Sequence, residues 1–316
     1  MSENSGISSP YHAGEKAIHK RLGITEKQEE IGKRVFRDHM PDQHREFFSQ
    51  LPYFIVGSAD EDGWPWASII FGVPGFISTP DDKHIKVAAQ IDETDPLYAN
   101  IKLNAPMSFL GIEMHTRRRN RANVSIEEIA SDGFTARIDQ SFGNCPKYIN
   151  HRSPDFTRTP TPSTTSVRKF TTIDMAVQQT IENADFFFVA SQIETQGNRT
   201  IEGVDVNHRG GKPGFIQISG NTLTIPDYFG NSIFNTLGNF MINPKAGLIF
   251  HNPQNASLLQ MVGTTEIIWD EDPILKHFEG AERAWRFTLD YGIERLQSVP
   301  MLWKLEALSP SFAKRR

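Results

Sequence analysis

One polar turn of the chain, DYFGNSIFNTLGN at residues 227–239, has the composition of an anion-binding site. A phosphate group needs several N–H donors, and the free amides at the start of a helix supply them along with a favourable dipole. The short residues of this turn would lie at the start of a predicted helix of about ten residues: Gly230, Asn231, Asn235 and Thr236. Glycine permits close approach of the backbone, and Asn and Thr bring short polar side chains. The alternative is that Asp227 or Asn231 only caps the helix.

The segment NHRGGKPGF at residues 207–215 is a second candidate. His208 and Arg209 precede a Gly-Gly turn that leads into a predicted strand. A guanidinium at such a place can hold a phosphate through two parallel hydrogen bonds. The alternative is an ordinary hairpin turn with a solvated arginine.

Four arginines crowd a third segment, HTRRRNRANV at residues 115–124. On a strand, Arg117, Arg119 and Arg121 would share one face, because successive side chains point to opposite faces. Such a row can clamp a phosphate or a carboxylate. The alternative is a solvated edge strand whose charges discourage aggregation.

A fourth segment, QSFGNCPKYI at residues 140–149, predicts a compact polar turn at the end of a strand, with Ser141, Asn144 and Lys147. Cys145 lies beside Lys147, a setting that can make a thiol reactive, although a structural role is the more common one for a lone cysteine. No Ser-His-Asp arrangement can be assembled from the spacing, and the histidines include no HxH or HxxxH pair. The sequence therefore identifies no catalytic residue, which stays unknown, and it predicts no metal site.

The composition bounds the classes of protein to consider. A chain of 316 residues is long enough for two domains, and 38% hydrophobic with 22% charged residues suits a packed globular core. A net charge of −5 argues against a dedicated nucleic-acid binder. The chain has no apolar run long enough for a membrane helix and no visible secretory signal, and one cysteine excludes an internal disulfide. We expect a cytoplasmic protein.

The secondary-structure pattern changes along the chain. Residues 13–50 show apolar positions at helical spacing, and β-rich runs separated by turns such as DEDG follow them. The Pro-, Ser- and Thr-rich residues 150–166 predict a linker or irregular loop, followed by a short helix in TIDMAVQQTIENA. Near the end, GAERAWRFTLDYGIERLQSV predicts an amphipathic helix whose Trp285 and Phe287 serve packing.

The second half of the chain repeats the first. LPYFIVGSADEDG matches NADFFFVASQIETQG, GVPGFIS matches GKPGFIQ, and NAPMSFLGIE matches NPKAGLIFHN. This order of elements predicts two copies of one β-barrel domain in a single chain. The expected domains are a helical N-terminal extension at 1–48, a first barrel at 49–150, a linker at 151–172, and a second barrel with a C-terminal helix at 173–316.

The ordered motifs GVDVNHRGGKPGFIQI and LTIPDYFGNSIFNTLGNFMINPKAGLIF resemble the pyridoxamine 5'-phosphate oxidase-like, FMN-binding split-barrel superfamily, in its predicted flavin-nucleotide-binding subgroup. The resemblance implies a mainly β fold of two tandem split barrels, an intramolecular pseudo-dimer with FMN between the barrels. It also implies an FMN-dependent oxidoreductase that takes a hydride from NAD(P)H or a substrate. The alternative function is a non-catalytic flavin or small-anion binder. FAD, a deazaflavin or haem is a less favoured cofactor than FMN. Two chains could also associate into a homodimer, on which the sequence is silent.

On this resemblance, the residues expected to contact the cofactor come from all four segments: His208, Arg209, Gly210, Gly211, Pro213, Gly214, Asp227, Tyr228, Gly230, Asn231, Asn235, Thr236, Arg119, Arg121, Ser141, Asn144 and Lys147. Gly211, Pro213 and Gly214 would let the flat ring lie against the main chain. Relatives often carry an arginine just after the Gly-Asn pair, where this chain has Ser232 and Ile233. The missing positive charge would have to come from elsewhere, for example from Arg209.

The first copy departs from the second at the phosphate turn. Its counterpart is DETDPLYANIKLN, which carries Asp92, Glu93 and Asp95 in place of the Gly-Asn turn. Three carboxylates would repel a phosphate. We therefore expect one flavin site, of the second-copy type, rather than two equal ones.

Overall fold

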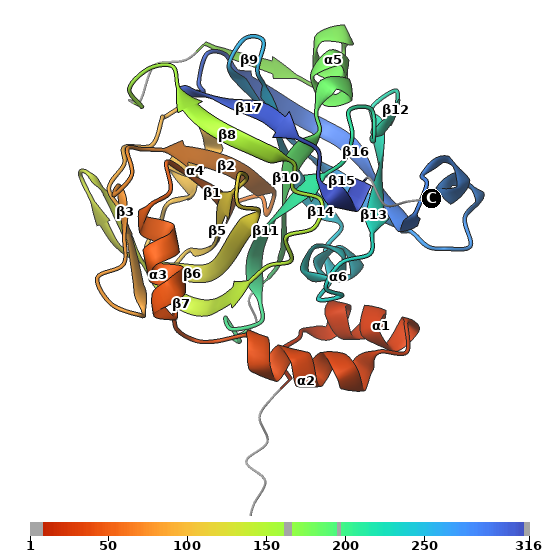
Figure 1. Cartoon of the computed structure of the whole chain (residues 1–316), viewed down its shortest axis with the longest axis horizontal. Helices are drawn as coiled ribbons and strands as arrows, with labels where there is room; N and C mark the ends of the chain where they lie inside the picture. Colours follow the sequence, from red (N-terminus) through yellow and green to blue (C-terminus); the bar gives the residue numbers. More distant parts are fainter. Residues whose placement is uncertain (1–8, 161–165, 195–196, 313–316) are drawn as a thin grey trace, which may run out of the picture.

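A computed structural model describes residues 9–160, 166–194 and 197–312 of the chain. Two antiparallel sheets, of seven and eight strands, form the centre of the molecule (Figure 1). Three helices precede them, α1 Ala13–Arg21, α2 Thr25–Val35 and α3 Asp42–Ser49. These helices confirm the helical pattern predicted for residues 13–50, and the sheets confirm the mainly β fold of two split barrels. Among the described residues, no helix is long and apolar enough to span a bilayer.

The earlier sheet has the strand order β2-β1-β5-β6-β7-β4-β3. Its strands are β1 Tyr53–Ala59, β2 Pro65–Phe71, β3 Ile77–Ser78, β4 His84–Val87, β5 Pro106–Glu113, β6 Arg118–Ala130 and β7 Gly133–Gly143. A short helix, α4 Pro96–Asn100, connects β4 to β5.

The later sheet has the order β11-β10-β14-β15-β16-β13-β12, with β9 Val167–Phe170 added beside β16. Its other strands are β10 Phe186–Ile193, β11 Gly203–Gly210, β12 Gln217–Ser219, β13 Thr222–Tyr228, β14 Lys245–Asn252, β15 Ser257–Ile268 and β16 Ala281–Arg295. Helix α6 Asn235–Ile242 connects β13 to β14, as α4 connects β4 to β5. Element for element, the two halves therefore have one topology.

Local sequence explains the first hairpin. The Asp60 carboxylate accepts hydrogen bonds from the backbone N–H groups of Asp62 (3.1 Å) and Trp64 (2.8 Å), which closes the turn between β1 and β2. Gly63 in the same turn has a φ of +73°, a conformation that L-residues rarely adopt. The turn sets the register in which Ile55 lies opposite Ile69.

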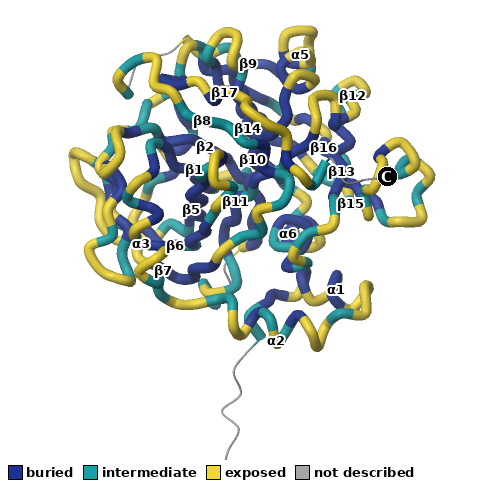
Figure 2. Tube along the Cα trace, in the orientation of Figure 1, coloured by how far each residue is buried: buried dark blue, intermediate teal, exposed yellow. Residues whose placement is uncertain are grey.

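Each sheet encloses an apolar core, and a third buried cluster joins the two sheets. Figure 2 shows the buried strands gathered at the centre and the exposed loops around them. The joining cluster includes Ile55 and Leu110 from the earlier sheet and Phe188 and Ile249 from the later one. The backbones also approach closely, since a Cβ on Gly247 would lie 2.0 Å from the carbonyl oxygen of Pro65. The two halves thus pack as an intramolecular pseudo-dimer.

The predicted C-terminal helix is wrong, because residues 281–295 form strand β16. The apolar residues Trp285, Phe287 and Leu289 alternate with polar ones, and their period of two buries them on one face of a strand. A further strand, β17 Met301–Ala307, follows and pairs with β8 His151–Phe156.

The predicted linker is wrong in part. Strand β8 occupies residues 151–156, and its Pro154 is tolerated because β8 and β17 form a sheet of only two strands. Residues 161–165 of the predicted linker lie outside the described residues. The short helix expected after it is confirmed as α5 Met175–Asn183, capped by Asp174.

Candidate functional site

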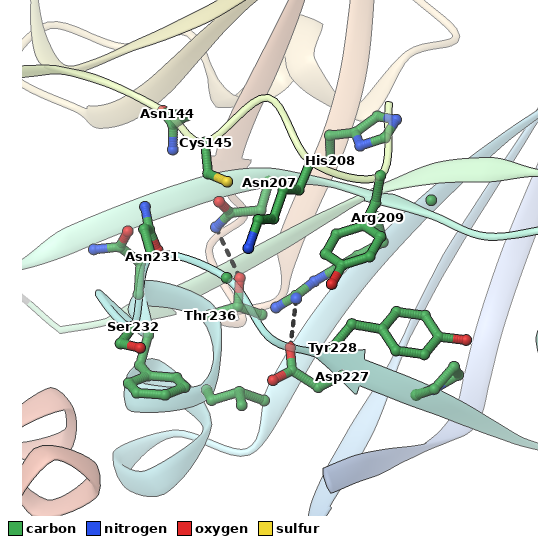
Figure 3. A pocket seen from close by; sticks show the side chains of 18 of the residues that line it. Asn144, Cys145, Asn207, His208, Arg209, Asp227, Tyr228, Asn231, Ser232 and Thr236 are labelled. Carbon is green, nitrogen blue, oxygen red and sulfur yellow. Dashed lines mark hydrogen bonds and ion pairs between the residues drawn. The ribbon is translucent and has the colours of Figure 1, made fainter. Parts of the chain in front are cut away.

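A polar cleft lies between the end of β11, the turn before α6 and the segment that follows β7 (Figure 3). Its cavity volume is about 110 Å³. The lining residues come from both halves: Arg119, Asn144, Cys145, Lys147 and Tyr148 from the earlier, and Asn207, His208, Arg209, Gly210, Phe215, Pro226, Asp227, Tyr228, Gly230, Asn231, Ser232, Phe234, Asn235, Thr236 and Leu237 from the later. The cleft therefore exists only because the two copies are packed together.

The turn before α6 presents a helix N-terminus that no side chain caps. The N-cap residue is Phe234, whose φ of 66° lies in the left-handed region, and Ser232 has a φ of 58°. Two non-glycine residues in this conformation within one short turn are uncommon, and such strain is typical of functional sites. The first residues of α6, Asn235 and Thr236, line the cleft, and no side chain in the described part of the chain caps this helix N-terminus.

Arg119 brings a positive charge into the cleft without a matching carboxylate. Its Nε donates to the backbone oxygen of Cys145 (2.7 Å), and within the described part of the chain no acidic side chain forms an ion pair with it. Burial lowers the pKa of Arg119 to about 10, an effect that the neighbouring Arg121 and Arg209 increase. The guanidinium therefore remains charged at neutral pH.

Arg209, by contrast, is already paired. It donates to the carboxylate of Asp227 at 2.6 Å (Figure 3). Arg283 approaches the same carboxylate at 3.6 Å. Lys147, on the opposite wall, places its Nζ 4.3 Å from the ring centroid of Phe229. Among the described residues, Arg119 and Lys147 form no ion pair with a carboxylate in this cleft, whereas Arg209, which the sequence suggested, does.

His208 lines the cleft as an uncharged ring. Burial, aided by the positive charges of Arg119 and Arg209, holds the pKa of His208 well below its usual range. Its ring stacks on Phe186 with centroids 6.0 Å apart, and its Nε2 has no hydrogen-bond partner in the described residues.

A buried polar network lies beneath the cleft. Arg121 is fully buried, donates to Asp205 (2.8 Å) and to the backbone oxygen of Val206 (2.8 Å), and contacts Asn207. Asn207 in turn donates to the hydroxyl of Thr236 at 2.7 Å (Figure 3). The network ties β6 of the earlier copy to the start of α6 in the later one.

Helix α1 supports the turn from outside, below α6 in Figure 1. The carboxylate of Glu15 accepts a hydrogen bond from Asn235 (2.7 Å), and Nε2 of His19 lies 2.9 Å from the backbone oxygen of Ser232. A Cβ on Gly14 would lie 2.0 Å from the carbonyl oxygen of Gly238, so α1 and α6 touch through their backbones. Sequence reasoning missed this role, although the capping box of His12 and Glu15 and the nearby glycine were visible signals of a fixed helix.

The protonation of Glu15 predicts a measurable pH dependence. Burial, and next the nearby Asp205 carboxylate, raise the pKa of Glu15 well above its usual range. Stability from this group is therefore fully present below the unfolded pKa of about 4.3 and is lost as the pH rises toward the raised value. Relative to wild type, the stability of Glu15→Gln should therefore increase as the pH rises above about 4.3. Urea unfolding at each pH measures the difference in the free energy of unfolding between the variant and wild type. Glu30→Gln, on the exposed face of α2, is the control. A difference between Glu15→Gln and wild type that does not change with pH would contradict the prediction.

Most of the residues predicted from the sequence meet in this cleft, and five do not. Gly211, Pro213 and Gly214 lie outside it; the last two line a different hollow, beside His277. Arg121 is buried in the network beneath, and Ser141 is buried against His44, 3.0 Å from its Nδ1. The edge-strand alternative for the arginines does not hold, because β6 lies between β5 and β7.

The sequence reasoning overlooked several lining residues. Asn207, Phe215, Ser232 and Phe234 lie within or beside the segments that were singled out, but their side chains gave no signal of their own. Backbone strain at Ser232 and Phe234 is visible only in the folded chain. Across the described residues, no group of His, Cys, Asp and Glu side chains has the arrangement of a metal site.

Comparison with known proteins gives a family for part of the chain. The family model described as pyridoxamine 5'-phosphate oxidase matches residues 40–160. No curated protein matches the chain.

Among solved structures, a variant of HupZ from Group A Streptococcus is 12% identical and covers 39% of this chain and 98% of its own, with a TM-score of 0.30. An FAD-binding protein from Mesorhizobium loti is 14% identical, and the match covers 40% of this chain and 97% of that protein, with a TM-score of 0.26. An FMN-binding protein from Syntrophomonas wolfei is 12% identical, and the match covers 39% of this chain and 96% of that protein, also with a TM-score of 0.26. The match shows that residues 40–160 of this chain are similar to the pyridoxamine 5'-phosphate oxidase family.

Proposed function

We propose that the cleft binds the phosphate of FMN and that the protein is an FMN-dependent oxidoreductase. The observation that carries the proposal is the partly buried guanidinium of Arg119, without a carboxylate partner among the described residues, beside the uncapped N-terminus of α6. A cation without a counter-ion and a set of free amides are together the preferred environment of a phosphate.

The charges of the cleft fit a phosphate dianion. Arg119, Lys147 and Arg209 bring three positive charges, and Asp227 brings one negative charge. The cavity of about 110 Å³ has room for the phosphate rather than for the ring system. Arg119, Lys147 and Thr236 would hold the phosphate, and the aromatic side chains of Tyr148, Phe215 and Tyr228 offer surfaces for the ring.

FMN supplies the hydride chemistry when it is bound, and the protein binds, orients and shields it. We propose a small-molecule electron donor such as NADH or NADPH. The neutral His208 contributes an uncharged wall, and the network from Arg121 through Asn207 fixes the hydroxyl of Thr236.

A non-catalytic flavin or anion carrier is the second candidate. It is favoured by the pairing of Asp227, the carboxylate that lines the cleft, with Arg209, because an ion-paired carboxylate is a poor general base. Turnover separates the two candidates. An FMN-loaded protein that oxidises NADH or NADPH supports the oxidoreductase, and one that binds FMN without turnover supports the carrier. A purified protein that takes up no FMN contradicts both flavin proposals.

Cys145 offers a direct test of where FMN binds. It is the single cysteine of the chain and it lines the cleft, so a thiol reagent reports on this one position. Saturating FMN should slow alkylation of Cys145 about tenfold or more, because a ligand within the protein excludes the reagent in proportion to its occupancy. The rate is measured by mass spectrometry of the labelled chain. Cys145→Ser should still bind FMN, and an alkylation rate unaffected by bound FMN would place the flavin elsewhere.

A further inference from the structure

A second cleft lies at the position in the earlier copy that corresponds to the polar cleft of the later copy. Its cavity volume is about 410 Å³, within the range of small-molecule sites. The end of β2 and the segment after β4 line it, as the end of β11 and the segment after β13 line the polar cleft. Residues after β16 close it, as residues after β7 close the polar cleft.

Strand register gives the matching residues. Ile69 lies opposite Ile55 in the earlier sheet, and His208 lies opposite Phe188 in the later sheet. Ile55 lies opposite Leu110 of β5, and Phe188 lies opposite Ile249 of β14. Leu110 and Ile249 occupy the same position along these two corresponding strands.

The same register makes Ile69 and Ile70 the counterparts of His208 and Arg209, and Leu258 the counterpart of Arg119. The positions that give the polar cleft its arginines and imidazole are therefore aliphatic in the second cleft.

In the second cleft, the side chain of Asp95 occupies the position at the N-terminus of α4 that a ligand anion would take. Asp95 is the N-cap of α4, as Phe234 is of α6, and its carboxylate accepts from the backbone N–H of Leu97 (3.0 Å). The same carboxylate accepts from the hydroxyl of Ser68 (2.6 Å) and pairs with Arg295. The first copy thus carries its own anion on the helix N-terminus. This side chain gives a more specific reason than charge repulsion alone to expect no phosphate site in the first copy.

The charge of the second cleft also disfavours an anion. Arg295 pairs with Asp92 at 3.0 Å as well as with Asp95, so one cation faces two carboxylates. Arg295 thus engages both carboxylates, and the rest of the lining is mainly apolar, with Gln90 and Ser298 as its other polar side chains. Phe71 and Phe76 offer aromatic surfaces, and Ala88 and Ala89 leave space beside them.

We propose that the second cleft is a binding site for an uncharged aromatic ring compound without a phosphate. Its volume, its largely aliphatic and aromatic lining and the excess of carboxylates over cations at its floor select such a ligand over an anion. The proposal rests on the second cleft alone and holds whether or not the first one takes FMN.

Lumichrome, an uncharged tricyclic ring without a side chain, is the probe for this site. Titration of the full chain, followed by quenching of lumichrome fluorescence, should show one saturable site that persists when FMN is in excess. Ala89→Trp fills the cleft and should weaken lumichrome binding tenfold or more. Ala88→Trp, at an exposed position of the same wall, serves if the first variant does not fold.

Two controls make the test specific. Ala176→Trp, on the exposed face of α5 and outside both clefts, should leave the binding of lumichrome unchanged. Arg119→Leu alters only the polar cleft and should also leave the binding of lumichrome to the second cleft unchanged. No saturable lumichrome binding, or binding unaffected by Ala89→Trp and Ala88→Trp, overturns the proposal. Two equivalents of FMN per chain would overturn it as well, since the second cleft would then accept a phosphate. Lumichrome binding without any FMN binding would contradict the function proposed for the polar cleft and support this one.

Discussion

Replacing Arg119 with leucine is expected to weaken FMN binding roughly thirtyfold, which corresponds to about 2 kcal/mol for a lost hydrogen bond to a charged group. Leucine is the residue at the matching position of the second cleft, Leu258, so the change is one that this fold already accommodates. Fluorescence titration of the apoprotein with FMN measures the dissociation constant.

The binding of riboflavin separates a phosphate contact from a general structural effect. Riboflavin lacks the phosphate, so Arg119→Leu should change its affinity much less than that of FMN. Arg118→Leu is the matched control, because Arg118 is exposed on the other face of the same strand, over the ring of Phe47. Equal losses for FMN and riboflavin would show that Arg119 does not contact the phosphate.

Replacing Arg121 with glutamine should have the largest effect on stability. Its guanidinium is fully buried and paired with Asp205, and removing one partner of such a pair costs about 3–5 kcal/mol. The cost arises because Asp205 would remain as an uncompensated charge, with the Glu15 carboxyl nearby. Urea unfolding gives the change in the free energy of unfolding.

A second substitution tests the cause of that loss. Adding Asp205→Asn to Arg121→Gln removes the stranded charge and should restore part of the lost stability. Glutamine is the natural residue at the equivalent position of the later copy, where Gln260 donates to the backbone oxygen of Ala67 at 2.9 Å. A loss below about 1 kcal/mol for the single variant would show that the pair contributes little.

The local sequence predicted the elements wherever one pattern dominated. The DEDG turn and its flanking apolar runs specified a hairpin, since the Asp60 carboxylate and Gly63 close the turn without help from the rest of the chain. Strand β16 was misread because its charged residues also fit a helical spacing. It pairs with the preceding strand β15 and with β13 and β9, which lie farther away in sequence, and this pairing selects the strand.

The polar cleft could be predicted in its composition but not in its electrostatics. Arg209 and Arg119 are alike in sequence, each within a short polar segment. Folding brings Asp227 to Arg209 and brings no carboxylate into an ion pair with Arg119 within the described residues, so the roles of the two arginines diverge. The support from α1 likewise joins residues more than two hundred positions apart, such as Glu15 and Asn235.

The sequence by itself determined that this chain contains two copies of one β fold and that the later copy kept a glycine- and asparagine-rich turn while the earlier copy acquired carboxylates. Those features depend on short segments, in which the residue types and their spacing directly restrict the backbone conformation. Only the tertiary structure decided which charges are neutralised, that Asp95 occupies the helix N-terminus of the earlier copy, and that Arg119 reaches across to the turn of the later one. Ion pairing and burial depend on distances between segments remote in sequence, and these distances are fixed when the two sheets pack against each other.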